Sequence, residues 1–448
     1  MQVSVETLSD LERRVTVQVP AERVAKEIQT RLQSLSRRVK LDGFRPGKVP
    51  LKLIKRLYGD QVRVETVSEL VEHSLHEALD QEKLSPLGGP KIEPKVLEEG
   101  QPLEYSATFE VMPEFEPAGF ENIKVERPVA EVTEQDVDHV IETLRQQRAI
   151  WNTVERPARA GDRVRLDFEG KIDGQDFAGN KQKNAQIVLG GKSLPPDFEA
   201  RLIGLSTGAE IEFDLTFPDD YQAREIAGKT AHFQVKLHGI EEAELPEVDD
   251  AFAENFDVKE AGVPALRQAV RENMEYQLRE GIQMVIKRQV MQGLLEVNAI
   301  PLPQVLIEAE IERLASQMRF QVSEDNEEIK KQIQQLKTQL FETEARRRVA
   351  LGLLISKLAA NQGIQVDEER VRARLDAFAA THEEPAEVLR HYEQTPKALD
   401  SVRALVLEEQ IADWVLERAQ VTERASTFAE IMATGKQPAE PTAQEVSE

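Results

Sequence analysis

The chain has 448 residues and a formal net charge of -24, with 81 acidic against 57 basic residues. Its length allows roughly three domains, and its hydrophobic content of 40% is enough for packed cores. The absence of cysteine excludes disulfides, thiolate metal sites and cysteine nucleophiles. A chain this acidic is also a poor free, non-specific ligand of nucleic acids.

Neither a membrane span nor a leader is expected. No apolar run approaches the ~18 residues that a transmembrane helix needs. Residues 1–6 lack both the basic start and the apolar core of a secretory signal. The chain is therefore predicted to work in the cytoplasm and to have no membrane partner.

Residues 1–115 are predicted to form an α+β domain. Residues 15–19 alternate between valine and polar side chains, as a half-buried strand does. Pro20 then marks a helix start, and helical spacing resumes at Leu51 and continues through Val64 to about residue 79. A Gly/Pro break at residues 85–90 is followed by a second alternating stretch, which ends the domain.

A basic segment interrupts this acidic chain. Residues 31–58 contain one acid, Asp42, and nine bases: Arg31, Arg37, Arg38, Lys40, Arg45, Lys48, Lys52, Lys55 and Arg56. The turn at their centre is Gly43-Phe44-Arg45-Pro46-Gly47-Lys48-Val49-Pro50. Charge alone leaves two interpretations open, a docking face for a polyanionic partner or a solvated face that joins two helices.

Residues 116–149 are predicted to be a linker with one helix, which Thr133-Glu134-Gln135-Asp136 would open as a capping box. The period then changes to two, and Asp173-Gly174 is typical of a hairpin turn. Residues 150–246 are therefore predicted to form a compact antiparallel β-sheet module with a short helix.

The second half of the chain is predicted to be helical. Apolar residues recur at four-residue spacing over residues 266–290, and further amphipathic stretches begin near residues 307, 329 and 399. No heptad pattern is sustained, so residues 247–434 are expected to form packed helical arms. Residues 435–448 are polar and expected to be disordered.

The β-rich module contains large rings that either share one core or line one cleft. They are Phe168, Phe177, Phe198, Tyr221 and Phe233. By contrast, His73 and His76 lie three residues apart on a predicted helix but have no third ligand fixed by the sequence. No metal site and no cofactor are expected.

The module resembles the FKBP-type peptidyl-prolyl isomerases. The resemblance rests on GDRVRLDFEG at residues 161–170, DGQDF at 173–177, LTFP at 215–218 and FQV at 233–235. It implies a cleft with Phe198 as the floor and with Phe168, Phe177, Tyr221 and Phe233 as walls. Two positions differ from that family. Ala178 stands where an acid is usual and Asp197 where glycine is usual. Isomerase activity is expected, and the sequence leaves open whether these two residues weaken it.

The order of the three parts resembles the bacterial trigger factor family, and the likeness covers residue 1 to about residue 430. It implies an ATP-independent chaperone that binds nascent or unfolded polypeptides beside the exit tunnel of the large ribosomal subunit, touching protein and rRNA. Phe44, Arg45 and Lys48 would make the contacts. Gly43, Pro46 and Gly47, with Pro50, would shape the loop. The resemblance also implies links to protein transport and cell division, and leaves a homodimer off the ribosome open.

Two other functions remain to be distinguished. One is a soluble FKBP-type prolyl isomerase whose helical halves only dimerise it, with no ribosome role. The other is a structural scaffold, which the aromatic cleft disfavours. Ribosome binding that depends on residues 43–50 would separate the first alternative from the chaperone.

Overall fold

The structure is a computed structural model. It describes residues 1–39, 41, 44, 49–96, 100–177, 179–191, 194–218, 226–256, 262–317, 327–380, 382 and 384–436. The chain forms two compact units, one containing residues 1–128 and 283–424, the other containing residues 129–282 and 425–435. The predicted fold class is confirmed. The chain is a multidomain α+β protein with an N-terminal α+β part, an antiparallel sheet with a short helix and a helical C-terminal part.

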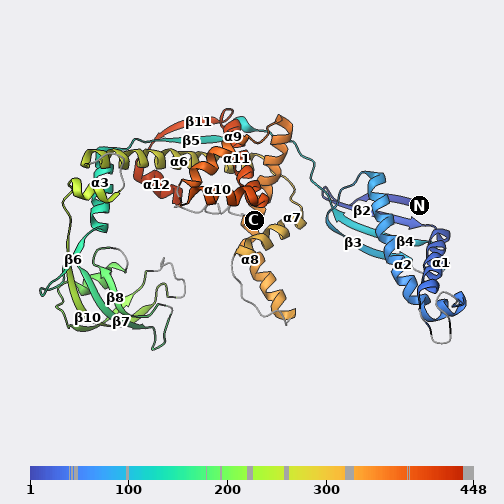
Figure 1. Ribbon diagram of the computed structural model, residues 1–448, viewed down its shortest axis with the longest axis horizontal. Coiled ribbons are helices and arrows are strands. Elements are labelled where there is room, and N and C mark those ends of the chain that lie inside the picture. The colour runs from blue at the N-terminus through green and yellow to red at the C-terminus, as the bar shows by residue number, and fades with distance from the viewer. Residues whose placement is uncertain are drawn as a thin grey trace, which may run out of the picture. The chain divides into compact units, whose positions relative to one another are not determined.

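The N-terminal part is a four-stranded antiparallel sheet in the order β1-β2-β4-β3. Its strands are β1 (Gln2–Thr7), β2 (Glu12–Val19), β3 (Leu87–Val96) and β4 (Leu103–Glu110). Val15, Val17 and Val19 are fully buried, which confirms the predicted alternation. Helix α2 (Leu51–Glu82) lies against the sheet, and α1 (Ala21–Arg38) packs beside α2 (Figure 1). Helix α2 supplies most of the helical side chains in this core.

Two details of this part differ from the prediction. Val64 is 66% exposed, because it lies on α2 away from the side that packs on the sheet. The Gly/Pro stretch expected only to break the helix also begins a strand, since β3 starts at Leu87 and contains the two glycines and Pro90. Gly88 makes this path possible with a φ of 75°.

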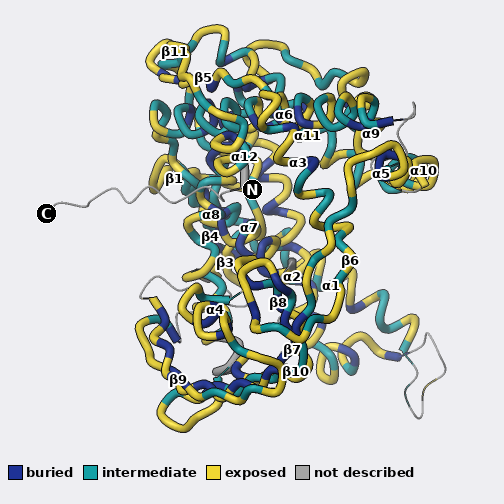
Figure 2. The backbone as a smooth tube through the Cα atoms, turned by 90° about the vertical axis from the view of Figure 1, so that its left-hand side faces the viewer, coloured by how far each residue is buried: buried dark blue, intermediate teal, exposed yellow. Residues whose placement is uncertain are grey.

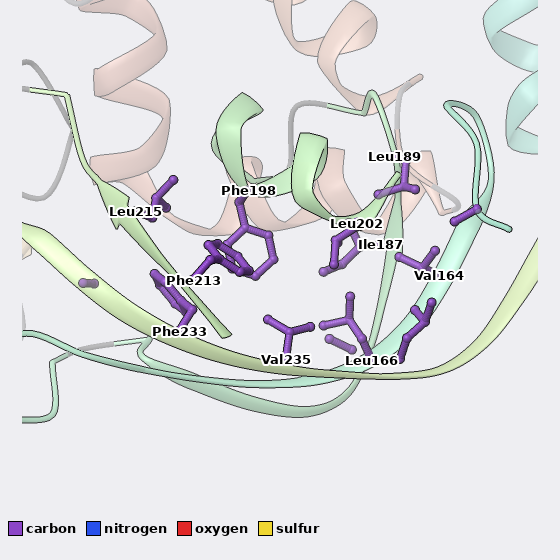
Figure 3. Close-up of a cluster of buried hydrophobic side chains, with 14 of the residues drawn as sticks. Val164, Leu166, Ile187, Leu189, Phe198, Leu202, Phe213, Leu215, Phe233 and Val235 are labelled. Carbon is purple, nitrogen blue, oxygen red and sulfur yellow. The ribbon is translucent and has the colours of Figure 1, made fainter. Parts of the chain in front are cut away.

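The second unit contains a five-stranded antiparallel sheet in the order β6-β10-β7-β8, with β9 also paired to β10. Its strands are β6 (Ile150–Thr153), β7 (Arg163–Lys171), β8 (Lys181–Val188), β9 (Glu210–Thr216) and β10 (Thr230–Glu244). Buried and exposed residues alternate along β9 and β10 (Figure 2). The short helix α4 (Pro196–Leu202) lies over the buried face (Figure 3).

The predicted hairpin and capping box are both present in this unit. Asp173 and Gly174 have φ values of 50° and 79°, and the flanking residues Ile172 and Gln175 exchange backbone hydrogen bonds of 3.1 and 2.9 Å. This is the geometry that a tight hairpin requires. At the start of α3 (Glu134–Gln147), the Asp136 amide donates to the Thr133 hydroxyl at 3.2 Å, and the Thr133 amide donates to the Asp136 carboxylate at 2.9 Å.

The remaining elements form the helical part. They are α5 (Asp250–Ala253), α6 (Val263–Val297), α7 (Gln304–Gln317), α8 (Glu327–Gln362), α9 (Glu368–Ala379), α10 (Pro385–Gln394), α11 (Pro396–Leu416), α12 (Phe428–Lys436), the strands β5 (Lys124–Val129) and β11 (Gln420–Ala425), and the 3-10 turns η1 (Phe120–Asn122) and η2 (Glu254–Phe256). A core formed by α6, α8 and α11 packs against Ile123 and Val125. A Cβ on Gly293 would lie 2.5 Å from Ile123, so glycine lets α6 approach this segment closely.

The β5–β11 ribbon was not expected from the sequence. Gln420 donates to the Ile123 carbonyl at 2.8 Å and Ser426 donates to the Val129 carbonyl at 2.9 Å, so both strands run in the same direction. At the chain end, α12 continues two residues into the stretch expected to be a disordered tail, and residues 437–448 lie outside the described residues. Within the described ranges, none of the helices has the length and apolarity to cross a membrane.

Candidate functional site

Phenyl rings from α4, two strands and a loop meet on the buried face of the second unit's sheet, and Figure 3 shows Phe198 and Phe233 among them. Phe198 comes from α4, and its ring centroid lies 5.2 Å from that of Phe233 on β10 and 5.9 Å from that of Phe168 on β7. Phe177, after the hairpin, lies 6.3 Å from Phe233. These pairs meet mostly edge to face, the arrangement that aromatic quadrupoles favour.

The path of the backbone explains why Phe233 is at the centre. In the sheet register, Phe233 lies opposite Gly170 of β7. A Cβ on Gly170 would lie 2.4 Å from the Phe233 ring, so the ring occupies the space that any other side chain would fill. The Nδ2 of Asn180 donates a hydrogen bond to the Gly170 carbonyl at 2.9 Å, which holds the backbone of β7 in place at this residue.

Helix α4 places Phe198 through a rigid N-terminus. Pro195 has a φ of -53° at the N-cap and Pro196 occupies the first turn, where proline is tolerated. Asp197 is exposed in that first turn, where a negative charge suits the helix dipole. The side chain that replaces the family's usual glycine therefore faces solvent and does not enter the ring cluster.

Glu199 ties α4 to the end of β8. Glu199 is buried, with only 8% of the residue exposed. Its Oε2 accepts a hydrogen bond from the Gly190 amide at 2.8 Å. Its Oε1 has no partner among the described residues. A buried carboxylate anchored by one amide thus fixes the residue that follows Phe198 in sequence.

A partly buried ion pair of the second unit lies in the loop before β7 and not among the phenyl rings. Burial alone would raise the pKa of the Asp162 carboxyl. The Arg156 guanidinium at 2.6 Å and the Arg159 amide at 2.8 Å have the larger combined effect, so the pKa of Asp162 lies below its usual range. Arg156 also pairs with Glu242 of β10 at 2.9 Å. This pair holds the loop before β7 in place, while the ring contacts themselves involve only phenylalanine.

Two of these four rings are enclosed, and the other two lie at the edge of the cluster. Phe198 and Phe233 are 1% and 4% exposed, whereas Phe168 and Phe177 are only partly buried. A small apolar group could therefore contact the cluster at the edge formed by Phe168 and Phe177. Such a surface can desolvate an amide.

The structure brings together four of the five rings singled out from the sequence, Phe168, Phe177, Phe198 and Phe233. Tyr221 and Ala178 lie outside the described residues. Two further rings that sequence reasoning did not assign to the site, Phe213 and Phe217, lie 6.0 and 6.4 Å from Phe233. The signal was available, because Phe213 lies in the alternating stretch that becomes β9 and Phe217 directly follows that strand.

The basic turn of the N-terminal part is described only in part. Phe44 is 40% exposed, and its amide donates to the Leu41 carbonyl at 3.1 Å. Leu41 and Val49 pack into a small core with α1 and α2, so both ends of the turn are anchored. Gly43, Arg45, Pro46, Gly47 and Lys48 lie outside the described residues, as do Lys40 and Asp42.

Several cations beside this turn are available to a partner. In the described part of the chain, Arg37, Arg38, Lys52 and Arg56 are exposed and make no ion pair. Arg31, by contrast, pairs with Glu69 at 2.8 Å. The four unpaired side chains and Phe44 are called the basic face below.

Histidines do not form a metal site in the described residues, where no group of three suitable ligands occurs. His73 contacts the Glu69 carbonyl through Nδ1 at 2.8 Å, which accounts for that side chain within its own helix.

An antiparallel sheet with phenyl rings gathered under a short helix defines an FKBP-type peptidyl-prolyl cis-trans isomerase domain, and the model of that family matches residues 154–238. The flanking regions match the family described as bacterial trigger factor protein over residues 1–144, and its C-terminus over residues 262–417. The chain therefore belongs to the bacterial trigger factor family, and it is a chaperone that carries an FKBP-type isomerase domain. The alternative of a free isomerase with dimerising helices is not supported.

The trigger factors of two named bacteria are similar to this chain over almost its whole length. The trigger factor of Alkalilimnicola ehrlichii is 46% identical over 440 residues, which cover 98% of this chain and 97% of that protein. The trigger factor of Stutzerimonas stutzeri is 44% identical over 438 residues, or 98% of this chain and 99% of that protein. A solved structure described as "Promiscuous Substrate Recognition in Folding and Assembly Activities of the Trigger Factor Chaperone" covers 93% of this chain and 99% of its own, at 20% identity and a TM-score of 0.49.

Replacing Gly170 by alanine tests the contact at the centre of the cluster. The new Cβ would overlap the Phe233 ring, so the variant Gly170→Ala should lose about 1–3 kcal/mol of unfolding free energy in the isomerase domain. Hydrogen exchange of the β7 and β10 amides in urea would measure this. Gly239→Ala is the control, because a Cβ there meets only the flexible end of Arg165 at 3.6 Å. Equal losses for the two variants would contradict the steric explanation.

Proposed function

We propose that this chain docks on the large ribosomal subunit beside the exit tunnel, holds nascent polypeptides there, and isomerises X-Pro bonds in a cleft of the second unit. The observation that carries the docking proposal is the exposed Phe44 ring near four exposed cations that have no ion-pair partner among the described residues, on a chain of net charge -24. Phe44 would be buried on a ribosomal protein. The cations would meet carboxylates or rRNA phosphates.

The turn itself completes the proposed contact. Arg45 and Lys48 would bind alongside Phe44, while Gly43, Pro46 and Gly47 would shape the loop that presents them. We place the chain in the cytoplasm, partly bound to ribosomes, and leave a homodimer off the ribosome open. Roles in protein transport and cell division remain predictions from the family resemblance.

For catalysis, the proposed cleft has Phe198 as its floor and Phe168, Phe177, Tyr221 and Phe233 as its walls. Rotation about a peptide bond has a barrier of ~18–20 kcal/mol, which falls when the amide loses resonance. An apolar surface disfavours the polar planar amide more than its twisted form, so it binds the transition state better than the ground state. This chemistry requires neither a nucleophile nor a cofactor.

For client binding, the supporting observation is the set of exposed apolar side chains on the helical part. Leu336 and Leu340 of α8 are 46% and 56% exposed and lie one helical turn apart. Phe378 of α9 and Met284 of α6 are exposed to 45% and 50%. Unfolded chains would be held by diffuse apolar contact with these residues, and released without a nucleotide cycle.

The isomerase proposal predicts that Phe198→Ala lowers kcat/KM for an X-Pro peptide at least about tenfold, because the cleft loses its floor. A protease-coupled assay would measure the rate. The control is Leu202→Ala, which empties a fully buried site on the same helix that is outside the ring contacts. If Phe198→Ala retains the full rate, Phe198 is not the floor.

The docking proposal predicts that the triple variant Phe44→Ala, Arg45→Ala, Lys48→Ala no longer co-sediments with ribosomes, while its circular dichroism is unchanged. Wild-type binding should also weaken as salt rises, because part of the contact is electrostatic. A matched triple variant replaces Phe378, Arg390 and Lys397, one exposed ring and two exposed cations, by alanine. Undiminished pelleting of the loop variant would refute this docking site.

The client proposal predicts that Leu336→Ser with Leu340→Ser weakens suppression of aggregation of a refolding protein about fivefold, since ~1 kcal/mol of apolar contact is lost. Light scattering without ribosomes would measure it. Leu57→Ser with Val64→Ser is the control, because these α2 side chains are similarly exposed, at 50% and 66%. Equal weakening by both pairs would show that α8 has no particular role.

A further inference from the structure

Phe213 of β9 contacts both central rings of the cluster. Its centroid lies 5.1 Å from that of Phe198 at an interplanar angle of 72°, and 6.0 Å from that of Phe233 at 27°. Since Phe198 and Phe233 are themselves 5.2 Å apart, the three rings are in mutual contact. Figure 3 shows the Phe213 ring beside that of Phe198, with Phe233 nearby.

The three rings are held by supports of different kinds. Phe213 and Phe233 are direct cross-strand partners in the β9–β10 ladder, so the sheet fixes both. Phe198 belongs to a helix of only seven residues. The orientation of its ring therefore depends on what it packs against. Phe213 makes the shortest of its three edge-to-face contacts, at 5.1 Å against 5.2 Å for Phe233 and 5.9 Å for Phe168.

Phe213 does not itself reach the open edge of the cluster. Phe213 is buried, as Phe198 and Phe233 are. Among the described residues its ring contacts are with those two rings and not with Phe168 or Phe177 at the edge. Phe213 would therefore act on a bound peptide through the rings that it contacts.

We propose that Phe213 is a positioning residue for the isomerase reaction, which fixes the orientation of Phe198 without touching the substrate. This inference rests on the proposed role of Phe198 as the floor of the cleft. A floor ring that is free to tilt would fit the twisted amide less well, because catalysis depends on geometry that is fixed before the substrate binds.

A double-mutant cycle tests this inference. The full-length chain would carry Phe213→Leu, Phe198→Ala, or both, and NMR exchange spectroscopy of an X-Pro peptide would give kcat and KM. Phe213→Leu alone should lower kcat about threefold to tenfold, the range expected for one lost aromatic pair, with KM unchanged. In the Phe198→Ala background, the same substitution should have almost no further effect.

Two controls separate positioning from general loosening of the core. Leu166→Val trims a fully buried residue that lies toward the other end of the same core in Figure 3, away from the rings, and should leave kcat unchanged. Phe213→Met has an unbranched, flexible side chain that can adapt to the space left by the ring, and it replaces Phe213→Leu in the cycle if the leucine variant does not fold.

The outcomes are distinct. Equal losses from Phe213→Leu in both backgrounds, or no loss in either, would overturn the positioning role while leaving Phe198 as the floor. If Phe198→Ala itself retains full activity, the proposed floor is wrong, and the inference falls with it. A loss that appears only when Phe198 is present supports the inference.

Discussion

The contact between the Phe233 ring and the backbone of Gly170 is the constraint on which the isomerase core depends. Because Gly170 has no side chain, the ring can lie across β7 and occupy the middle of the concave face. The rings that then pack around it are Phe168, Phe177, Phe198, Phe213 and Phe217. One glycine in a strand, normally a weakening choice, thus allows six rings to share one site.

Charge is distributed over this chain in a way that serves two opposing needs. Exposed leucines on α8 would favour self-association, and a net charge of -24 opposes it through repulsion between copies. The same charge would repel a polyanion, except where α1 and α2 present Arg37, Arg38, Lys52 and Arg56 without acidic partners in the described residues. A polyanionic surface would therefore approach this chain most favourably at the basic face.

The sequence correctly predicted those structural elements that depend only on residues close together in the chain. The valines of β2, the capping box at Thr133 and the turn at Asp173-Gly174 each depend on residues within a few positions of one another. The β5–β11 ribbon could not be predicted in this way. Val125 and Pro128 are the buried residues of β5, a spacing of three that lacks the strand period, and every residue of β11 is exposed. The ribbon joins segments about 300 residues apart in the chain, and α6 packs closely on Ile123, the residue before β5 whose carbonyl accepts from Gln420.

The candidate site could likewise be predicted from the sequence only in part. The sequence shows which phenylalanines face inward, because inward residues alternate along β9 and β10, but a cleft ring and a core ring have the same pattern. Only packing distinguishes them. Phe168 and Phe177 are partly buried at the edge, while Phe198, Phe213 and Phe233 are enclosed. Since the proposed floor is itself part of the hydrophobic core, the side chains that stabilise this domain also set the shape of the surface where the amide would be twisted. Substitutions there should be judged by activity and stability together.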